Sequence, residues 1–523
     1  MKKIVFPIIA ICATLLILEG CEPGIQESNI PGENSLTTYS YSVAVSAVNQ
    51  TNAPALQSFA HGVAGDDILL FGGRTNQEAL DGGLHNLSAN YADSSFVPRS
   101  YNKNIYVYNI TNDERFTMLS DSLLAKLKKQ FPAIDSSNPE FFKNSLNSLF
   151  KVTNPISTQE GDTLYVLGGY GYGPNLGDSA KYYTYNQVST IDVPTMIKLV
   201  KGIALDASEW QNLIRFGTDT SNSLISAGAE MFKIGDSIYL AGGHNFRDSV
   251  GQKYLDAVYP FVVIDDARPC KLNVSVGNFI SNVIDPKAKA SDSSTFRRRD
   301  GPVTAALFQG SDGEIIEGFN FYAGVFMPSK ADNPWSTAIN IHPASGPRYT
   351  IDRAYNQKSQ SVYACSDFVG YDSTASTLHT FLLGGIGNDT TDLNSTLVGT
   401  KGEIRWLKAF TNSGLHVQMD LKTMKSKEPA VLSNVFPSDT THLYGAESTL
   451  IPWSTSLLSY VQINGTDTEV LDLDKTFPAN NTITVGYVFG GIEAFQLNPG
   501  TYGPSNSAAS NKVWEVTLTR LKN

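Results

Sequence analysis

Residues 162–173 read DTLYVLGGYGYG, in which an apolar run of strand-forming residues meets a pair of glycines and then a tyrosine-rich segment. The same arrangement recurs as DDILLFGGRTN at 66–76, DSIYLAGGHNF at 236–246, HTFLLGGIGND at 379–389 and TVGYVFGGIEA at 484–494. Self-similar segments of this kind indicate a repeated supersecondary unit rather than a single strand–loop junction. The repeat therefore decides the fold, and the rest of the chain is interpreted around it.

Each apolar run lacks the alternation of a half-exposed strand and favours a strand covered on both faces, as in the blades of a β-propeller. The glycines allow positive φ and a close approach of neighbouring backbone. A variable loop then leads to a second strand, which we place in NIYVYNITNDERF (104–116), NQVSTIDVPTM (186–196), VYPFVVIDDARP (258–269), GLHVQMDLKTMKS (414–426) and NKVWEVTLTRL (511–521). The first four of these reach an Asp or Asn that can start a turn.

The order of apolar run, Gly-Gly, loop, strand and turn resembles the kelch repeat of the galactose oxidase/kelch superfamily. The resemblance covers the chain from about residue 37 to its end, and it implies an all-β, kelch-like β-propeller occupying 37–523. The structural repeat glycines are Gly72, Gly73, Gly168, Gly169, Gly242, Gly243, Gly384, Gly385, Gly490 and Gly491.

The number of blades depends on one long gap. Gly242 and Gly384 are 142 positions apart, which is too long for one repeat of roughly 50 residues. The gap contains GPVTAALFQG, GFNFYAGVFMP and PWSTAINIHP, which resemble a degenerate unit at about 299–345 whose glycine pair has become Ala323-Gly324. We therefore predict six blades, with seven as the alternative.

The two ends of the propeller are predicted to meet in its last blade. TTYSYSVAVSAVN at 37–49 alternates strictly in polarity, and Trp514, Val516 and Leu518 alternate in the same way near the C-terminus. An open sheet edge is prone to pair with other chains. Closing the ring with both strands would remove that edge.

Two insertions carry helical patterns. The segment at about 121–150 has two short patterns broken at Pro132, and the segment at about 193–216 offers Asp206 or Ser208 as a helix cap. We expect both insertions to cover the blades, and a docking surface is the alternative.

The N-terminus predicts a lipoprotein. Residues 1–20 combine Lys2 and Lys3 with a 15-residue apolar stretch, which is short for a membrane span and typical of a signal peptide. The sequence before Cys21 resembles the lipobox of bacterial lipoproteins, which implies acylation of Cys21 (palmitate among the acyl chains) and a flexible linker over 21–36. Glu22 resembles the residue that follows the cysteine in lipoproteins sorted to the outer membrane. We expect a lipid-anchored outer-membrane protein on the periplasmic face or at the cell surface.

Composition narrows the functional classes. The formal net charge of -11 argues against nucleic acid, whose binding rests on cationic contacts to phosphate. Cys270 and Cys365 are the cysteines that remain beyond Cys21; two separately buried thiols are the simpler interpretation, and a disulfide is the alternative. Triplets such as Asp121-Ser122-Leu123 resemble the O-glycosylation sites of Bacteroidetes.

The sequence contains no recognisable catalytic motif. It lacks HExxH, CxxC, a Walker loop and GxSxG. The copper chemistry of galactose-oxidase-like relatives is not expected either, because the histidines are scattered and no cysteine lies in a comparable context. We predict no cofactor and no metal.

Charged residues that begin a blade or follow a glycine pair are candidates for a ligand-facing rim around the propeller axis. Such residues could protonate and deprotonate a sugar ring, as in mutarotase-like kelch proteins, or they could be ordinary solvated charges. The candidates are Arg74, His244, Arg299, Asp300, Glu447 and Glu493.

The expected function is a non-catalytic binding module, an accessory subunit that contacts another outer-membrane protein such as a β-barrel. One alternative is a sugar mutarotase or epimerase. Another is a carbohydrate-binding lipoprotein that feeds a transporter, with Tyr170, Tyr172 and the KYYTY loop at 181–185 as the sugar platform.

Overall fold

The computed structural model describes residues 39–75, 84, 96, 98–172, 182–247, 251–281, 294–325, 334–335, 337–344, 348–357, 363–387, 409–437, 442–452, 458–477, 481–495 and 507–522. Small antiparallel sheets dominate these residues, which confirms the predicted all-β class, and none of the sheets closes on itself. The helices within the described residues are too short or too polar to cross a membrane. The predicted signal peptide, Cys21 and the linker lie outside the described residues.

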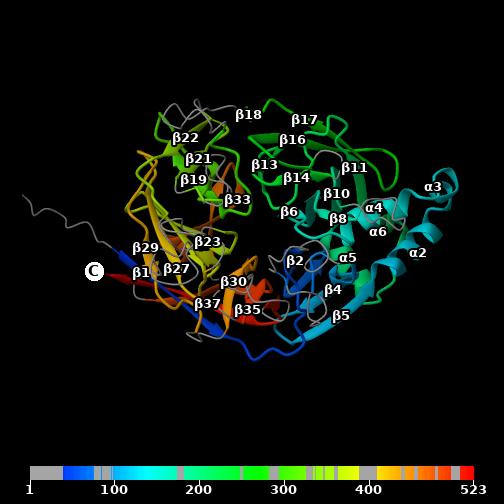
Figure 1. The fold of residues 1–523 in the computed structure, drawn as a ribbon, viewed down its shortest axis with the longest axis horizontal. Helices are drawn as coiled ribbons and strands as arrows, with labels where there is room; N and C mark the ends of the chain where they lie inside the picture. Colours follow the sequence, from blue (N-terminus) through cyan, green and yellow to red (C-terminus); the bar gives the residue numbers. More distant parts are fainter. Residues whose placement is uncertain are drawn as a thin grey trace, which may run out of the picture.

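Six sheets of the described chain follow one another in sequence, share the same plan and are arranged around a common centre (Figure 1). Sheet 1 contains β2 (Ala60–Ala64), β3 (Asp67–Phe71), β4 (Asn104–Asn109) and β5 (Glu114–Leu119). Sheet 2 contains β6 (Ile156–Glu160), β7 (Thr163–Leu167), β10 (Gln187–Asp192) and β11 (Ile214–Thr218). Sheet 3 contains β12 (Glu230–Ile234), β13 (Ser237–Ala241), β16 (Ala257–Asp265) and β17 (Leu272–Val276), with β18 (Ile280–Ser281) beside β16.

The other three sheets repeat this plan with one addition. Sheet 4 contains β19 (Val303–Gln309), β20 (Ile315–Phe321), β21 (Ala338–Ile341) and β22 (Tyr349–Asp352). Sheet 5 contains β23 (Ser366–Asp372), β24 (Thr377–Leu383), β27 (Gly414–Asp420), β28 (Lys425–Ser426) and β29 (Ala430–Leu432). Sheet 6 contains β31 (Thr449–Pro452), β34 (Thr482–Phe489), β37 (Val513–Lys522) and β1 (Tyr39–Ala47). The addition is a hairpin, β32 (Tyr460–Ile463) and β33 (Thr466–Asp472), whose β33 pairs in parallel with β23.

The apolar runs of the repeat are covered on both faces, as predicted. In β3, Leu69 and Phe71 belong to an apolar cluster shared with sheet 2, whereas Ile68 and Leu70 belong to one shared with sheet 6. Comparable clusters lie between sheets 2 and 3, 3 and 4, 4 and 5, and 5 and 6. Each fully buried side chain of this size contributes roughly 1.5–3 kcal/mol. The core is therefore divided into layers, one between each pair of neighbouring sheets.

The glycine pairs join each sheet to the next. Both glycines of every pair have positive φ. A Cβ on Gly168 would collide with the carbonyl oxygen of Ser226, so this close approach requires glycine. The second glycine donates its backbone N–H to the following unit: Gly73 to Val152 at 2.7 Å, Gly169 to Ser226 at 3.0 Å, Gly243 to Arg298 at 2.9 Å, Gly385 to Tyr444 at 3.2 Å and Gly491 to Leu56 at 2.8 Å.

The last of these bonds connects sheet 6 back to sheet 1. The chain ends meet in sheet 6 as the sequence predicted, because β1 pairs with β37 over its whole length, from Tyr39 opposite Lys522 to Ala47 opposite Trp514. The degenerate unit is sheet 4. There Ala323 adopts φ +37° and Gly324 adopts φ +86°, so the alanine takes the backbone conformation of the missing glycine.

The helical insertions pack on the outside of sheets 1 and 2. They contain α2 (Ser120–Gln130), α3 (Pro132–Ser137), α4 (Phe141–Phe150), α5 (Val193–Val200) and α6 (Ala207–Asn212), while η2 (Pro98–Ser100) and α7 (Leu473–Thr476) lie elsewhere. Phe142 and Leu146 of α4 and Met196 of α5 are buried in the apolar cluster between those sheets. Asp206 caps α6, as predicted. The second insertion ends earlier than predicted, since residues 214–216 begin β11.

Shorter strands on the loops form three further small sheets. β8 (Tyr170–Tyr172), β9 (Tyr182–Thr184), β14 (His244–Arg247) and β15 (Gly251–Tyr254) form one. β25 (Ile386–Gly387) pairs with β26 (Ala409–Phe410), and β30 (Leu443–Ala446), β35 (Ile492–Ala494) and β36 (Ser507–Ala509) form the third.

Candidate functional site

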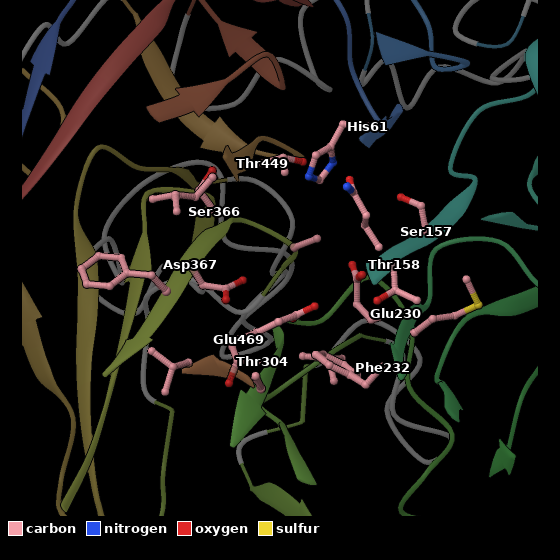
Figure 2. Close-up of a pocket in the computed structure, with 18 of the residues that line it drawn as sticks. His61, Ser157, Thr158, Glu230, Phe232, Thr304, Ser366, Asp367, Thr449 and Glu469 are labelled. Atoms are coloured by element: carbon pink, nitrogen blue, oxygen red, sulfur yellow. The ribbon is translucent and has the colours of Figure 1, made fainter. Parts of the chain in front are cut away.

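A cavity of about 600 Å³ lies where the six sheets meet. Its walls come from the first strand of every sheet (β2, β6, β12, β19, β23 and β31) and from the added hairpin. Figure 2 shows polar side chains entering this hollow from strands on different sides. The volume is in the range of small-molecule sites, about 300–1,000 Å³.

Backbone hydrogen bonds link the residues that lie at one end of the cavity. These residues precede the six first strands, and we call them the ring residues: Ser58, Asn154, Gly228, Asp300, Ala364 and Glu447. Four links run from the backbone N–H of one ring residue to the carbonyl of the previous one: Asn154 to Ser58 (3.0 Å), Asp300 to Gly228 (3.1 Å), Ala364 to Asp300 (2.7 Å) and Glu447 to Ala364 (2.9 Å). Together with the glycine bonds, these links join every pair of neighbouring sheets.

The two carboxyl groups of the ring, Asp300 and Glu447, are held by several donors. Arg299 Nε lies 2.9 Å from Asp300 Oδ2, and Asn154 Nδ2 donates to Glu447 Oε2 at 3.2 Å. Ser58 Oγ also donates to Glu447. Burial raises the pKa of Asp300, while Arg299 and a hydrogen bond from Tyr363 act in the opposite direction.

Burial also raises the pKa of Glu447, and the nearby Asp300 carboxyl adds to that rise. Hydrogen bonds from Ser58 and Tyr363, and the charge of Arg74, act to lower it. Arg74 is buried, its Nε donates to Gln57 Oε1 at 3.2 Å, and its guanidinium stacks over the Phe96 ring at 4.0 Å. The fold thus brings four of the predicted rim residues together, with the two carboxyls on the cavity and the two arginines behind them.

The other two predicted rim residues lie outside the cavity wall. His244 begins β14, and burial followed by the charge of Arg299 lowers its pKa well below the usual value, which keeps the imidazole neutral. Glu493 lies in β35, where its Oε1 is 2.6 Å from His442 Nδ1 and accepts a hydrogen bond from Tyr444 at 3.2 Å. Neither side chain faces the ligand-sized space.

Two of the tyrosines proposed as a sugar platform pack on each other. Tyr170 and Tyr182 stack with ring centroids 5.4 Å apart and planes 3° apart, and Phe246 meets Tyr170 edge-on at 5.8 Å. The stacking contact covers one face of each of the two tyrosine rings and stabilises the loop sheet. Lys181 and the side chain of Tyr172 lie outside the described residues.

Three carboxylates that sequence reasoning missed point toward one another inside the cavity: Glu230 from β12, Asp367 from β23 and Glu469 from the hairpin strand β33 (Figure 2). None of the three makes a hydrogen bond or an ion pair within the described part of the chain. At this level the cavity reaches Gly161 and Asp467, which are exposed, at the end opposite the ring.

Enclosure and mutual repulsion change the acidity of these three groups. Burial raises the pKa of Glu230 to about 8, with a further contribution from Asp367. Burial, and then Glu469, raises the pKa of Asp367 to about 8. Burial, and then Glu317, raises the pKa of Glu469 to about 7. The cavity is therefore crowded with acidic groups that lack a countercharge.

The remainder of the lining supplies no positive charge to balance them. The described lining residues include no Lys or Arg, and burial lowers the pKa of the lining histidine, His61, to about 4, so its imidazole is neutral at pH 7. No three His, Cys, Asp or Glu side chains among the described residues are close enough to share a metal ion.

Cys270 and Cys365 are separate buried thiols, so the disulfide alternative is wrong. Cys270 lies in the apolar cluster between sheets 1 and 2, and Cys365 lies beside the ring in the cavity wall. Packing in different layers of the fold keeps the two sulfurs apart.

A weak signal for two of the missed carboxylates exists in the sequence. Glu230 and Asp367 follow their ring residues by two and three positions, so both lie in the strand that precedes an apolar run and glycine pair. Glu469 has no such signal, because its hairpin is an insertion within the last repeat.

Comparison with known proteins adds little to this geometry. No family model matches the sequence, and no curated protein matches it. Among solved structures, a chain described as the structure of YjhT is similar over 88% of this chain and 100% of that chain, with 10% sequence identity and a TM-score of 0.40. A likeness at this level carries no argument about function.

Proposed function

We propose that the protein is a six-bladed, kelch-like β-propeller that acts as a lipid-anchored binding module, with the axial cavity as its ligand site. The six sheets would be the blades. Support for the blade count comes from the backbone bonds between successive sheets, which return from Gly491 to Leu56, and from the apolar layer between each pair of neighbours. Sheet 4, with its Ala323-Gly324 hinge, is one of the six.

The observation that carries the binding function is the cavity itself. Six separate strands and one inserted hairpin each place side chains in the same space, and backbone hydrogen bonds link the ring residues at one end of it. Binding sites on strands keep their geometry better than sites on loops, because hydrogen bonding on both sides restrains the backbone. A propeller with an axial cavity built on strands is therefore suited to hold a small molecule.

A cavity-filling substitution tests this function. Thr449 lines the hollow from β31 and lies near His61 in Figure 2. The full-length protein, purified in mild detergent, would be incubated with a small-molecule extract of its own cells and examined by native mass spectrometry. We expect wild type and Thr449→Val to retain a ligand and Thr449→Phe to lose it. Equal retention by Thr449→Phe would refute the axial site.

The anchor and the partner complete the proposal. Cys21 would carry the acyl chains, and the propeller would serve as an accessory subunit of an outer-membrane complex that includes a β-barrel protein. Metabolic labelling with an alkyne palmitate should mark the wild type and leave Cys21→Ser unlabelled. Solubilisation in mild detergent should recover a second membrane protein with the chain, and recovery of a lone monomer would contradict the partnership.

The acid–base alternative has one observation in its favour. Asp300 and Glu447 are adjacent carboxyls with raised pKa values beside two arginines, an arrangement that can exchange protons with a sugar ring. If the protein catalyses mutarotation, NMR should show faster α/β interconversion of a free aldose with the wild type than with Glu447→Gln. Equal rates would leave these two carboxyls with a structural role.

A further inference from the structure

We infer that the axial cavity binds a small organic cation that carries at least two separated ammonium groups, with Glu230, Asp367 and Glu469 as its counterions. This inference rests on the proposed function, because it names the ligand class of the same cavity.

The charge distribution supplies the first argument. Three carboxylates from three different elements face one enclosed space, and no cationic side chain lines that space in the described part of the chain. Ionised carboxylates taken from water are costly unless they are paired, and these three have no partner among the residues that the structure describes. A ligand that brings positive charge would supply the missing interaction, whereas an anion would be repelled.

An unpartnered hydroxyl supplies an independent argument. Thr304 of β19 lines the cavity, is only 1% exposed, and its Oγ1 has no hydrogen-bond partner. Figure 2 shows Thr304 and Glu469 among the side chains that line this cavity. Leaving a buried hydroxyl without a partner is costly. An ammonium group in the cavity would give Oγ1 a donor and would bring positive charge to the carboxylates of the same lining.

The separation of the carboxylates argues against a single metal ion. A divalent ion such as Ca²⁺ needs 6–8 oxygen ligands at about 2.3–2.6 Å. The described residues include no cluster of three acidic, histidine or cysteine side chains that could share one ion. An extended molecule with charges at both ends can instead reach carboxylates on opposite walls.

The apolar part of the lining fits the rest of such a molecule. Met231 and Phe232 of β12 and Leu450 of β31 face the same space as the carboxylates. Methylene groups are stabilised by burial, and an ammonium group is attracted to the face of a phenyl ring. An aliphatic diamine combines both features.

Isothermal titration calorimetry on the full-length protein in mild detergent tests the inference with four matched probes: 1,5-diaminopentane, 1-aminopentane, 1,5-pentanediol and glutarate. We expect one diamine per chain, at least tenfold weaker binding of the monoamine, and no measurable binding of the diol or the dianion. Binding of glutarate or the diol as tightly as the diamine would overturn the inference, and so would the absence of diamine binding.

Variants locate the binding. Asp367→Asn and Glu469→Gln keep the side-chain shape and should each weaken diamine binding at least fivefold, and Thr304→Val should weaken it about threefold. Asp312→Asn removes the same charge from an exposed turn and should change the affinity less than twofold. Thermal melting of every variant separates loss of binding from loss of folding. If Asp367→Asn and Glu469→Gln both bind like wild type, the assignment is wrong.

The outcomes distinguish this inference from the proposed function. A neutral ligand that the wild type retains and Thr449→Phe loses would preserve the axial binding site and refute the cation. Retention of every ligand by Thr449→Phe would refute the site itself.

Discussion

The axial cavity holds two sets of carboxyl groups, and their surroundings differ. At one end, Asp300 and Glu447 belong to the ring residues and receive hydrogen bonds or ion pairs from Ser58, Asn154 and Arg299. Farther along the cavity, Glu230, Asp367 and Glu469 face the same space without a partner among the described residues. All five groups have raised pKa values, so burial alone does not separate the two sets.

The difference lies in what the protein provides for each set. Donors from neighbouring sheets surround the ring carboxyls, so these groups cross-link the sheets. Among the described residues no donor surrounds the other three, so their ionised forms weaken the empty protein, and a cationic ligand would stabilise those forms. Functional sites commonly carry this cost in stability. Partnered carboxyls should therefore stabilise the fold, and unpartnered ones should destabilise it.

The largest expected change in stability follows substitution of Glu447, one of the ring residues. Glu447→Ala removes the acceptor of Ser58 and Asn154 and should lower the free energy of unfolding by about 2–3 kcal/mol, because buried donors lose their partner. Glu447→Gln keeps an acceptor oxygen at the same backbone conformation and should lose less. Chemical denaturation measures both, and losses below about 0.5 kcal/mol for both variants would remove the structural role of the ring.

The pH dependence of stability should reveal the unpartnered set. The folded pKa values of Glu230 and Asp367, about 8, exceed the unfolded values of about 4, so the folded state binds extra protons between these limits. Stability should therefore fall as pH rises from 7 to 8, by at most about 1.4 kcal/mol per unit for each carboxyl, and should level off above about pH 8. The other titratable side chains that line the described cavity are those of Asp300, Glu447, Glu469, Asp467, His61, Tyr460 and Cys365, and Glu317 acts on Glu469 from outside the lining.

Denaturation of the empty protein at pH 7, 8 and 9 provides the measurement. His61 is neutral in the folded chain throughout this window, since burial lowers its pKa to about 4. The free energy of unfolding should fall less steeply with pH in Asp367→Asn than in the wild type. A stability that rises from pH 7 to 9 in the wild type would contradict the comparison.

Neutralising one unpartnered carboxylate should stabilise the empty protein. Asp367→Asn removes repulsion with Glu469 and should raise the free energy of unfolding at pH 9 by about 1 kcal/mol. Asp312→Asn, on an exposed turn, should change it by less than about 0.5 kcal/mol. If Asp367→Asn instead lowers the free energy of unfolding at pH 9, Asp367 stabilises the fold as the ring carboxyls do, and the prediction is wrong.

The smallest effect concerns two buried threonines. Thr304 Oγ1 has no partner, whereas Thr380 Oγ1 lies 3.2 Å from the hydroxyl of Tyr322, and both residues are 1% exposed. Thr304→Val should stabilise the empty protein by about 0.5 kcal/mol, and Thr380→Val should destabilise it by about 1 kcal/mol. Thermal melting compares them, and equal losses in both would show that the Thr304 hydroxyl is satisfied.

Local sequence was sufficient for several features. The Gly168-Gly169 pair predicts a backbone that closely approaches the next unit, as the structure shows. Sheet 4 could be predicted although Ala323 stands in place of a glycine, because alanine still adopts positive φ there. Asp206 caps its helix as its position indicates. The strict alternation of residues 39–47 also identified a strand, and this strand, β1, pairs with β37.

The candidate site was predicted only in part. Asp300 and Glu447 were found because they precede the first strand of a repeated unit, and the arrangement that brings Arg74 and Arg299 behind them follows from the same repeat. Glu469 was missed, since the hairpin that carries it pairs with β23, about 100 positions earlier in the chain. Long-range pairing of that kind leaves no periodic signal in the sequence.

By itself, the sequence determined the repeated unit: apolar runs that need cover on both faces, glycine hinges with positive φ, and alternating end strands. These properties depend on neighbouring residues and on backbone sterics, so they are legible in short windows. The tertiary structure alone decided which carboxyl groups receive partners and which face an empty space. That outcome depends on the register of strands far apart in the chain, because a shift of one residue turns a side chain from the cavity to the core.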